Sequence, residues 1–283
     1  MATKQAARAK TSRTNGAKTK VGNAARARAD AAFIPDHRSE WESSPRWVRA
    51  KLANVTVADS RHVMLLRETG RLPVYYFPTK DVRTDLLMPT GHTARNPQFG
   101  MAEYSNLKVN GTIAENAAWA YTRLAPGAPN LKGYVAFEWN KMDAWFEEDD
   151  EVYVHPRDPY KRIDVMHSSR HIQVVIDGET VADTHRPRLL FETSLPTRYY
   201  LPKTDVRMEL LVSSDKHTRC PYKGVASYYS VKIGDKVYPD LVWYYPLPIP
   251  ECPKIENLLC FFNEKVDIYM DGELEPRPVT PWS

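Results

Sequence analysis

The chain has 283 residues, of which 42% are hydrophobic, 26% charged and 11% aromatic. This composition is typical of a globular protein, and the length accommodates two domains. Tyr, Trp and Pro are frequent while Gly is scarce, which favours strands with proline-marked ends over long helices. No apolar run approaches the roughly 18 residues of a membrane-spanning helix, so we expect no membrane segment. The N-terminus has no apolar core, which argues against a secretory signal.

The net charge of +4 hides a strongly basic N-terminal segment. Residues 1–30 hold eight Lys or Arg and one acid, whereas the rest of the chain holds 31 basic and 34 acidic residues. Such a segment has too little apolar surface to offset its ordering entropy, so we expect a disordered basic tail. We favour a solubility tail. Weak nucleic-acid contact or nuclear import, and an organelle transit peptide, are the alternatives.

An internal repeat follows the tail. The same residues return at a constant offset of 124 positions, as from Asp59 to Asp183 (183 − 59). The clearest matches are residues 57–59 with 181–183, 75–83 with 199–207, and 119–121 with 243–245. The alignment needs no gap between 44–148 and 168–272, so the chain is a duplicated domain.

Within each copy the apolar pattern has a period of two, which predicts strands. Asp177-Gly178 in the second copy and Asn110-Gly111 in the first separate alternating runs and predict hairpins. A further turn is expected at Gly234-Asp235, and a last strand pair over 258–270. No capped amphipathic stretch is long enough to predict a helix, so the fold class is mainly β.

The predicted organisation has five parts. They are a tail and lead-in over 1–43, a first compact β domain over 44–148, a connector over 149–167, a second compact β domain over 168–272 and a Pro-rich C-terminal tail over 273–283. The charges and two prolines of the connector favour an ordered, partly extended segment.

Two aromatic pairs have i, i+2 spacing, so each pair points to one face of its strand. They are Trp119 with Tyr121 and Trp243 with Tyr245. We favour core packing for both. The alternative is an aromatic wall of a ligand pocket in the second copy, and its candidate residues are Tyr199, Tyr222, Tyr228, Trp243 and Tyr245.

Each copy contains one acid–base pair at the same position. Asp81 and Arg83, and their counterparts Asp205 and Arg207, lie two residues apart on segments that read as strands. Charged pairs of this kind usually form structural ion-pair networks. We therefore predict a structural role for them, at a sheet edge or a domain seam.

The copies differ most informatively where residues 95–100 align with 219–224. Arg, Pro and Gly are kept at three positions. At the other three, Asn96, Gln98 and Phe99 of the first copy face Cys220, Tyr222 and Lys223 of the second. The kept residues predict a shared turn, and the differing residues predict that chemistry belongs to the second copy.

Cys220 is the candidate nucleophile. His217, Arg219 and Lys223 lie within three residues of it and can carry positive charge, which favours the thiolate. This pattern predicts an enzyme in which His217 or Lys223 is the acid–base partner, with Arg219 among the ligand contacts. The plain interpretation is a cysteine that fills a turn as a small apolar residue.

The cysteine count bears on compartment and metal. Three cysteines without a C-x-x-C pair argue against a disulfide framework and for a reducing compartment, which makes us expect an intracellular protein, cytoplasmic or nuclear. Closely spaced Cys or His ligands for structural zinc are not apparent, so we expect neither a metal nor a cofactor.

Over roughly residues 44–272 the chain resembles the family called domain of unknown function 427. The motifs that carry the resemblance are Glu192-Thr193, Tyr199-Tyr200-x-Pro202-x-x-Asp205-Val206-Arg207, Thr218-Arg219-Cys220-Pro221-Tyr222-Lys223-Gly224, Trp243-x-Tyr245-Pro246 and, in the first copy, Phe137-x-Trp139-x-x-Met142-Asp143-Ala144-Trp145-Phe146-Glu147-Glu148-Asp149. The resemblance implies domains of the β-tent type, as in B-type methionine sulfoxide reductase and the thalidomide-binding domain of cereblon. The family is also labelled a nucleotidyltransferase domain. The residues here support no such activity, because they include neither a Gly-Ser motif nor the paired metal-binding carboxylates that it needs.

We therefore expect a binding module for an unknown small molecule or peptide, with its pocket in the second copy. An enzyme that uses Cys220 is one alternative. A pseudo-dimeric structural protein is another.

Overall fold

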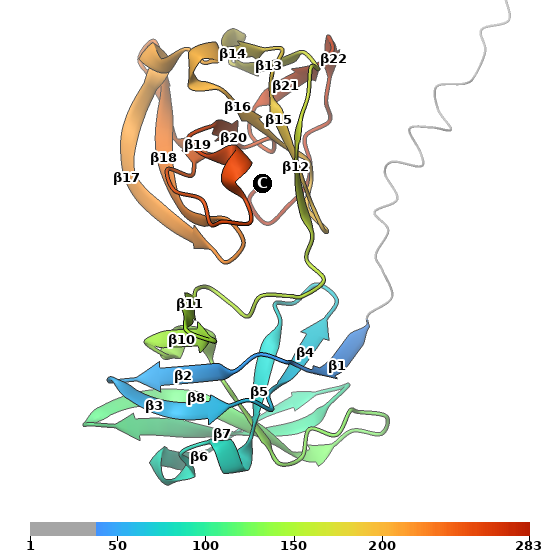
Figure 1. The fold of residues 1–283 in the computed structure, drawn as a ribbon, viewed down its shortest axis with the longest axis vertical. Helices are drawn as coiled ribbons and strands as arrows, with labels where there is room; N and C mark the ends of the chain where they lie inside the picture. Colours follow the sequence, from blue (N-terminus) through green and yellow to red (C-terminus); the bar gives the residue numbers. More distant parts are fainter. Residues whose placement is uncertain (1–37) are drawn as a thin grey trace, which may run out of the picture. The chain divides into compact units, whose positions relative to one another are not determined.

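The computed structural model describes residues 38–283, drawn as a coloured ribbon in Figure 1. The predicted disordered tail over 1–30 and the first part of the lead-in, residues 31–37, lie outside the described residues. The described part consists of antiparallel β-sheets and short 3-10 helices, which confirms the mainly β prediction. None of the described helices is long and apolar enough to cross a membrane.

The first repeat comprises β1 to β11. Its strands are β1 (Ser39–Ser43), β2 (Val48–Leu52), β3 (Val55–Ser60), β4 (Met64–Glu68), β5 (Val74–Pro78), β6 (Leu87–Asn96), β7 (Gly100–Val109), β8 (Thr112–Leu124), β9 (Tyr134–Phe137), β10 (Ala144–Glu147) and β11 (Asp150–Val152). Its 3-10 helices are η1 (Thr79–Asp81), η2 (Thr84–Leu86) and η3 (Trp139–Lys141).

The second repeat comprises β12 to β22. Its strands are β12 (Ile163–His167), β13 (Ile172–Ile176), β14 (Glu179–Thr184), β15 (Arg188–Glu192), β16 (Arg198–Leu201), β17 (Leu211–Cys220), β18 (Gly224–Ile233), β19 (Lys236–Tyr244), β20 (Leu259–Phe261), β21 (Asp267–Met270) and β22 (Glu273–Leu274). Its 3-10 helices are η4 (Lys203–Asp205), η5 (Met208–Leu210) and η6 (Pro253–Ile255).

The two repeats have the same topology. The seven-stranded sheets have the orders β1-β4-β5-β9-β8-β7-β6 and β12-β15-β16-β20-β19-β18-β17, and these correspond strand for strand. The four-stranded sheets, β3-β2-β10-β11 and β14-β13-β21-β22, correspond in the same way. Trp119 lies on β8 and Trp243 on the equivalent β19. The predicted duplication is therefore confirmed as one fold used twice.

Each seven-stranded sheet carries a buried cluster on both faces, while its edge strands β6 and β17 are largely exposed. Along β5, Tyr75 and Phe77 face the four-stranded sheet, while Tyr76 between them packs into a second cluster on the opposite face. Tyr199 and Tyr200 on β16 divide in the same way. This alternation follows from the period of two. Each large apolar side chain buried in this way contributes about 1.5–3 kcal/mol of transfer free energy.

Two of the predicted hairpins have the turn chemistry that their sequences require. Asn110 and Gly111 have φ angles of 46° and 84°, and Asp177 and Gly178 have φ angles of 50° and 81°. Positive φ at both central residues defines the type I′ turn, which Asn-Gly and Asp-Gly favour. The turn residues thus fix the pairing next to each turn, and β-bulges shift the register further along both hairpins.

Each repeat in the structure begins earlier than the predicted starts at 44 and 168. The strands β1 and β12 pair with β4 and β15 and form one edge of each large sheet. The sequences of β1 and β12, SEWES and IDVMH, share no residue at equivalent positions, which is why comparison of the repeats did not reveal them. The predicted connector 149–167 therefore contributes β11 and β12 to the sheets.

The conserved acid–base pairs do not lie on strands. Asp81 and Asp205 end the 3-10 helices η1 and η4, and the following arginines turn to other partners. Asp205 pairs with Arg186 at 2.7 Å, and Arg207 bonds Glu179 and Glu209. The proline that precedes each acid starts a tight turn instead of continuing the strand.

Candidate functional site

Lys223 is the centre of a buried charge cluster in the second repeat. Its ammonium lies 2.5 Å from Oε2 of Glu192, and the side chains are only 9% and 5% exposed. Lys161 from the connector approaches the other carboxylate oxygen at 3.4 Å. Burial of a charged group is costly unless it is paired, so the Glu192 carboxylate holds Lys223 in place.

Cys220 borders this cluster. It ends β17, is half-buried, and its Sγ lies 3.9 Å from Nζ of Lys223. The ammonium is therefore close enough to stabilise a thiolate at Cys220. Because Lys223 already donates to Glu192, its place in the structure is that of a fixed positive charge and not of a free base.

The turn beside Cys220 requires glycine. Gly224 has a φ of 105°, and a Cβ atom there would lie 3.2 Å from the carbonyl oxygen of Leu247. Gly100 of the first repeat has a φ of 113°, and its Cβ atom would clash with the backbone of Arg123. Both positions need the freedom of glycine at positive φ. This explains why the two copies keep this residue.

Aromatic side chains form the wall behind Cys220. Trp243, Tyr228 and Tyr245 belong to one buried cluster, and Cys220 packs against it. The indole of Trp243 donates to the hydroxyl of Tyr200 at 3.1 Å. The i, i+2 pair of Trp243 and Tyr245 therefore shares a face as predicted, and its contacts are those of core packing.

Four of the predicted site residues make their contacts outside the aromatic cluster behind Cys220. Tyr199 belongs to the core on the opposite face of the sheet. His217 is exposed and its ring bonds Ser227 at 3.2 Å. Arg219 stacks on Tyr153 of the connector at 4.0 Å. The hydroxyl of Tyr222 accepts a hydrogen bond from the backbone N–H of Asp158 at 2.7 Å.

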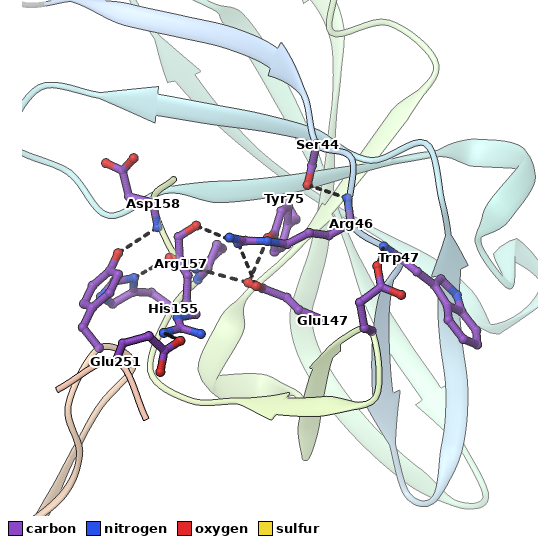
Figure 2. A network of polar contacts seen from close by, with 12 residues as sticks. Ser44, Arg46, Trp47, Tyr75, Glu147, His155, Arg157, Asp158 and Glu251 are labelled. Carbon is purple, nitrogen blue, oxygen red and sulfur yellow. Dashed lines mark hydrogen bonds and ion pairs between the residues drawn. The ribbon is translucent and has the colours of Figure 1, made fainter. Parts of the chain in front are cut away.

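The connector residues that meet Tyr222 belong to a polar network, shown in Figure 2. Its hub is Glu147 of β10, whose carboxylate accepts from Arg46 at 2.7 Å and from Tyr75 at 2.9 Å. The backbone N–H of Arg157 also donates to Glu147 at 3.2 Å, and its guanidinium pairs with Glu251 at 2.8 Å. Tyr222 and Arg219 therefore anchor the connector.

The equivalent place in the first repeat has no charge cluster of this kind. Asn96 replaces the cysteine, and its side-chain oxygen accepts from the backbone of Gln98 at 2.9 Å and of Phe99 at 3.2 Å. Phe99 replaces the lysine and is fully buried against Tyr121. In the first repeat the same turn is thus stabilised by the side-chain amide of Asn96 and by the buried ring of Phe99.

A groove of about 460 Å³ lies close to the cluster. It is lined by residues 162–166 of the β12 region and by residues 251–254, which span the start of η6. Cys252 lies in the groove wall and also packs in the aromatic cluster with Cys220. The sequence alone does not reveal this groove, because β12 lies in the stretch that reads as connector. The alternation of Ile163 and Val165 with charged residues was the available signal.

A second group that sequence reasoning did not single out is His171, Asp183 and His185. The hairpin of β13 and β14 brings their ligand atoms within 4.8 Å of one another. The Asp-x-His spacing at the end of β14 and a histidine directly before β13 were the available signals.

A family model named Domain of unknown function (DUF427) matches the chain twice, over residues 40–148 and 164–272. A comparison with curated proteins found no match. The two matched segments begin within β1 and β12, in agreement with the edge strands of the structure.

Proposed function

The chain belongs to the DUF427 family, and we propose that this member is a binding module that holds a short, extended peptide in the groove beside β12 of the second repeat. The observation that carries the proposal is a groove that runs along an edge strand. Extended peptides bind such edges by adding a strand, with backbone hydrogen bonds for affinity and side-chain pockets for specificity.

The register of β12 gives the direction of its backbone groups. Arg162 accepts a hydrogen bond from the backbone N–H of Thr193, so alternate residues from Arg162 onward bond to β15. The intervening residues Ile163 and Val165 therefore direct their backbone groups away from the sheet. The carbonyl oxygen of Val165 accepts from the Lys254 side chain at 3.1 Å, as this geometry requires.

The groove has the mixed lining that peptide sites use. Ile163, Val165 and Cys252 provide apolar surface, whereas Asp164, Glu251 and Lys254 provide charge. Lys254 covers part of the edge through an exposed hydrogen bond to Val165, which a ligand can replace without opening the core. A ligand carbonyl or carboxylate could take over the lysine as a partner.

The test is a selection from a display library of random heptapeptides on the full-length protein. We expect peptides with alternating apolar residues, and we expect Val165→Pro to weaken a selected peptide at least about tenfold, because it removes one backbone donor and adds bulk at the edge. Proline is tolerated there, since the N–H of an edge residue that faces outward makes no ladder bond.

Val165→Thr is the matched control, since it keeps the N–H and the branched shape. Peptide affinity that is equal in the proline and threonine variants would contradict strand addition. Thermal-shift screening against nucleotides, cofactors and metabolites on the same variants tests the small-molecule alternative.

A second candidate function is thiol chemistry at Cys220. The 3.9 Å approach of the Lys223 ammonium favours it, whereas the orientation of His217 towards Ser227 leaves that histidine without a role. A Cys220→Ala variant that keeps peptide binding but loses a thiol-dependent turnover would support the enzyme. Unchanged turnover in Cys220→Ala would rule out a catalytic role for this thiol.

A further inference from the structure

His171, Gln173, Asp183 and His185 form a two-by-two array on one face of the β13–β14 hairpin. Gln173 faces Asp183 across the hairpin, and the same register places His171 opposite His185. Residues two apart on a strand share a face, so all four side chains lie together. The pairing of β13 with β14 brings these positions together, and β21 supports β13 from its other side.

The array has the contacts of a nearly formed ligand set. Nε2 of His171 lies 2.7 Å from Oδ1 of Asp183, and the imidazoles of His171 and His185 are stacked with centroids 4.1 Å apart. Gln173 donates to the other oxygen of Asp183 at 2.9 Å. Gln173 therefore holds one oxygen of the Asp183 carboxylate, while the other oxygen faces the imidazole of His171.

The first repeat uses the same positions differently. Trp47 stands where the second repeat has His171, and its indole N–H donates to Asp59 at 2.6 Å. Arg61 stands in place of His185, with its guanidinium 5.0 Å from the Trp47 ring centroid. The bond from a ring nitrogen to a carboxylate is thus part of the shared scaffold. Where the first repeat has two residues that do not bind metal, the second has two histidines.

We propose that His171, Asp183 and His185 bind a divalent first-row transition metal, with Zn²⁺ the principal candidate. Two imidazoles and a carboxylate are donors that zinc accepts, and three protein ligands leave a position open to solvent or to another ligand. Donor atoms about 3.3 Å apart suit tetrahedral zinc with bonds near 2.0 Å. The side chains, now within 4.8 Å, reach this spacing by rotation alone because they lie on an accessible face.

The surroundings support a cation. The two neighbouring guanidiniums are neutralised, since Arg170 pairs with Asp271 and Arg186 with Asp205, each at 2.7 Å. Gln173 donates a hydrogen bond to the carboxylate of Asp183 and so holds this proposed ligand in place. Loss of such a partner lowers metal affinity by about 10- to 100-fold.

The test is a titration of the tag-free, full-length protein with Co²⁺, followed by its visible absorption, and with Zn²⁺ by calorimetry. We expect one saturable site per chain and displacement of Co²⁺ by Zn²⁺. His185→Arg and His171→Trp carry the residues of the first repeat, so the hairpin accommodates them, and each should abolish the visible band. Gln173→Ala should weaken binding about tenfold.

His217→Gln is the matched control, because it removes an exposed histidine of the same repeat outside the array. It should leave the titration unchanged. Asp183→Asn keeps the shape of the side chain and removes its charge, so it tests the ligand role if another variant unfolds. Absence of a saturable site in the native protein would overturn the proposal. Binding that survives both histidine substitutions in folded variants would also overturn it.

Discussion

Arg198 and Glu264 make a buried ion pair whose loss should cost much of the stability of the second repeat. The guanidinium donates to both carboxylate oxygens, at 2.8 and 2.7 Å, and the Glu264 side chain is 0% exposed. Thr280 from the C-terminal tail donates a further bond at 2.6 Å. Substitution of Arg198 by Val leaves the carboxylate enclosed and unpaired, which costs about 3–5 kcal/mol.

The first repeat supplies the residues for a double-mutant cycle. Val74 and Asn140 occupy the equivalent positions of the first repeat. The variants Arg198→Val, Glu264→Asn and their combination therefore introduce residues that this fold already accommodates. The double variant should recover at least about 2 kcal/mol of the loss in Arg198→Val, because it removes the unpaired charge. Arg277→Val is the control. Its pair with Asp267 is exposed, so its loss should cost at most about 1 kcal/mol.

The measurement is urea unfolding followed by tryptophan fluorescence, with thermal unfolding alongside. For a domain of this size, 1 kcal/mol corresponds to about 4–8 °C, so Arg198→Val should lower the melting temperature of the second repeat by at least about 10 °C. A loss below about 1 kcal/mol, or a double variant as unstable as the single one, would refute the reasoning.

Three further outcomes are expected. Burial opposes ionisation of Glu264, but the bonds from Arg198 and Thr280 outweigh it and lower its pKa to about 2. The contribution of Glu264 to stability should therefore be complete above the ordinary glutamate pKa of about 4.3 and lost as pH falls towards 2. Unfolding measured as a function of acid pH should show this loss in the native protein but not in Glu264→Gln. Cys220 should react with limiting iodoacetamide faster than Cys252 or Cys260, because burial raises the pKa of Cys252 to about 11 and also raises that of Cys260. Equal labelling of the three cysteines in mass spectrometry would contradict this. Lys223→Phe, which imports the residue of the first repeat, should destabilise by at least about 2 kcal/mol because Glu192 loses its closest partner, and Glu192→Gln should restore part of that loss in chemical denaturation.

The sequence predicted the architecture because duplication and turn chemistry are local signals. The 124-residue offset located both domains, and Asp177-Gly178 located a hairpin and its turn type. The edge strands β1 and β12 were missed because they share no residue. The segment 258–270 was expected to form a strand pair, but β20 and β21 lie in different sheets, since pairing between distant segments leaves no local pattern.

The candidate site was predicted only in part. Proximity of Cys220 and Lys223 followed from their spacing in a turn, whereas the partner of Lys223 is Glu192, a distant residue on β15. The orientations of Tyr222 and Arg219 towards the connector also depend on tertiary contacts. Such contacts arise from the fold as a whole, so neither spacing nor charge pattern reveals them.

The matching registers of β1 and β12 create a hazard during folding. Either strand could offer the correct backbone pairing to the sheet of the other repeat, and tandem repeats are prone to such misassembly. Side chains distinguish the two strands. Trp41 of β1 packs at 5.2 Å from Tyr76 and 5.3 Å from Tyr134, whereas Val165 occupies the equivalent place in β12. An exchanged pair would leave a void beside Tyr76 and Tyr134, because valine is smaller than tryptophan, and would crowd the equivalent place in the second repeat. The divergence of these edge strands therefore lets each half of the chain recognise its own first strand.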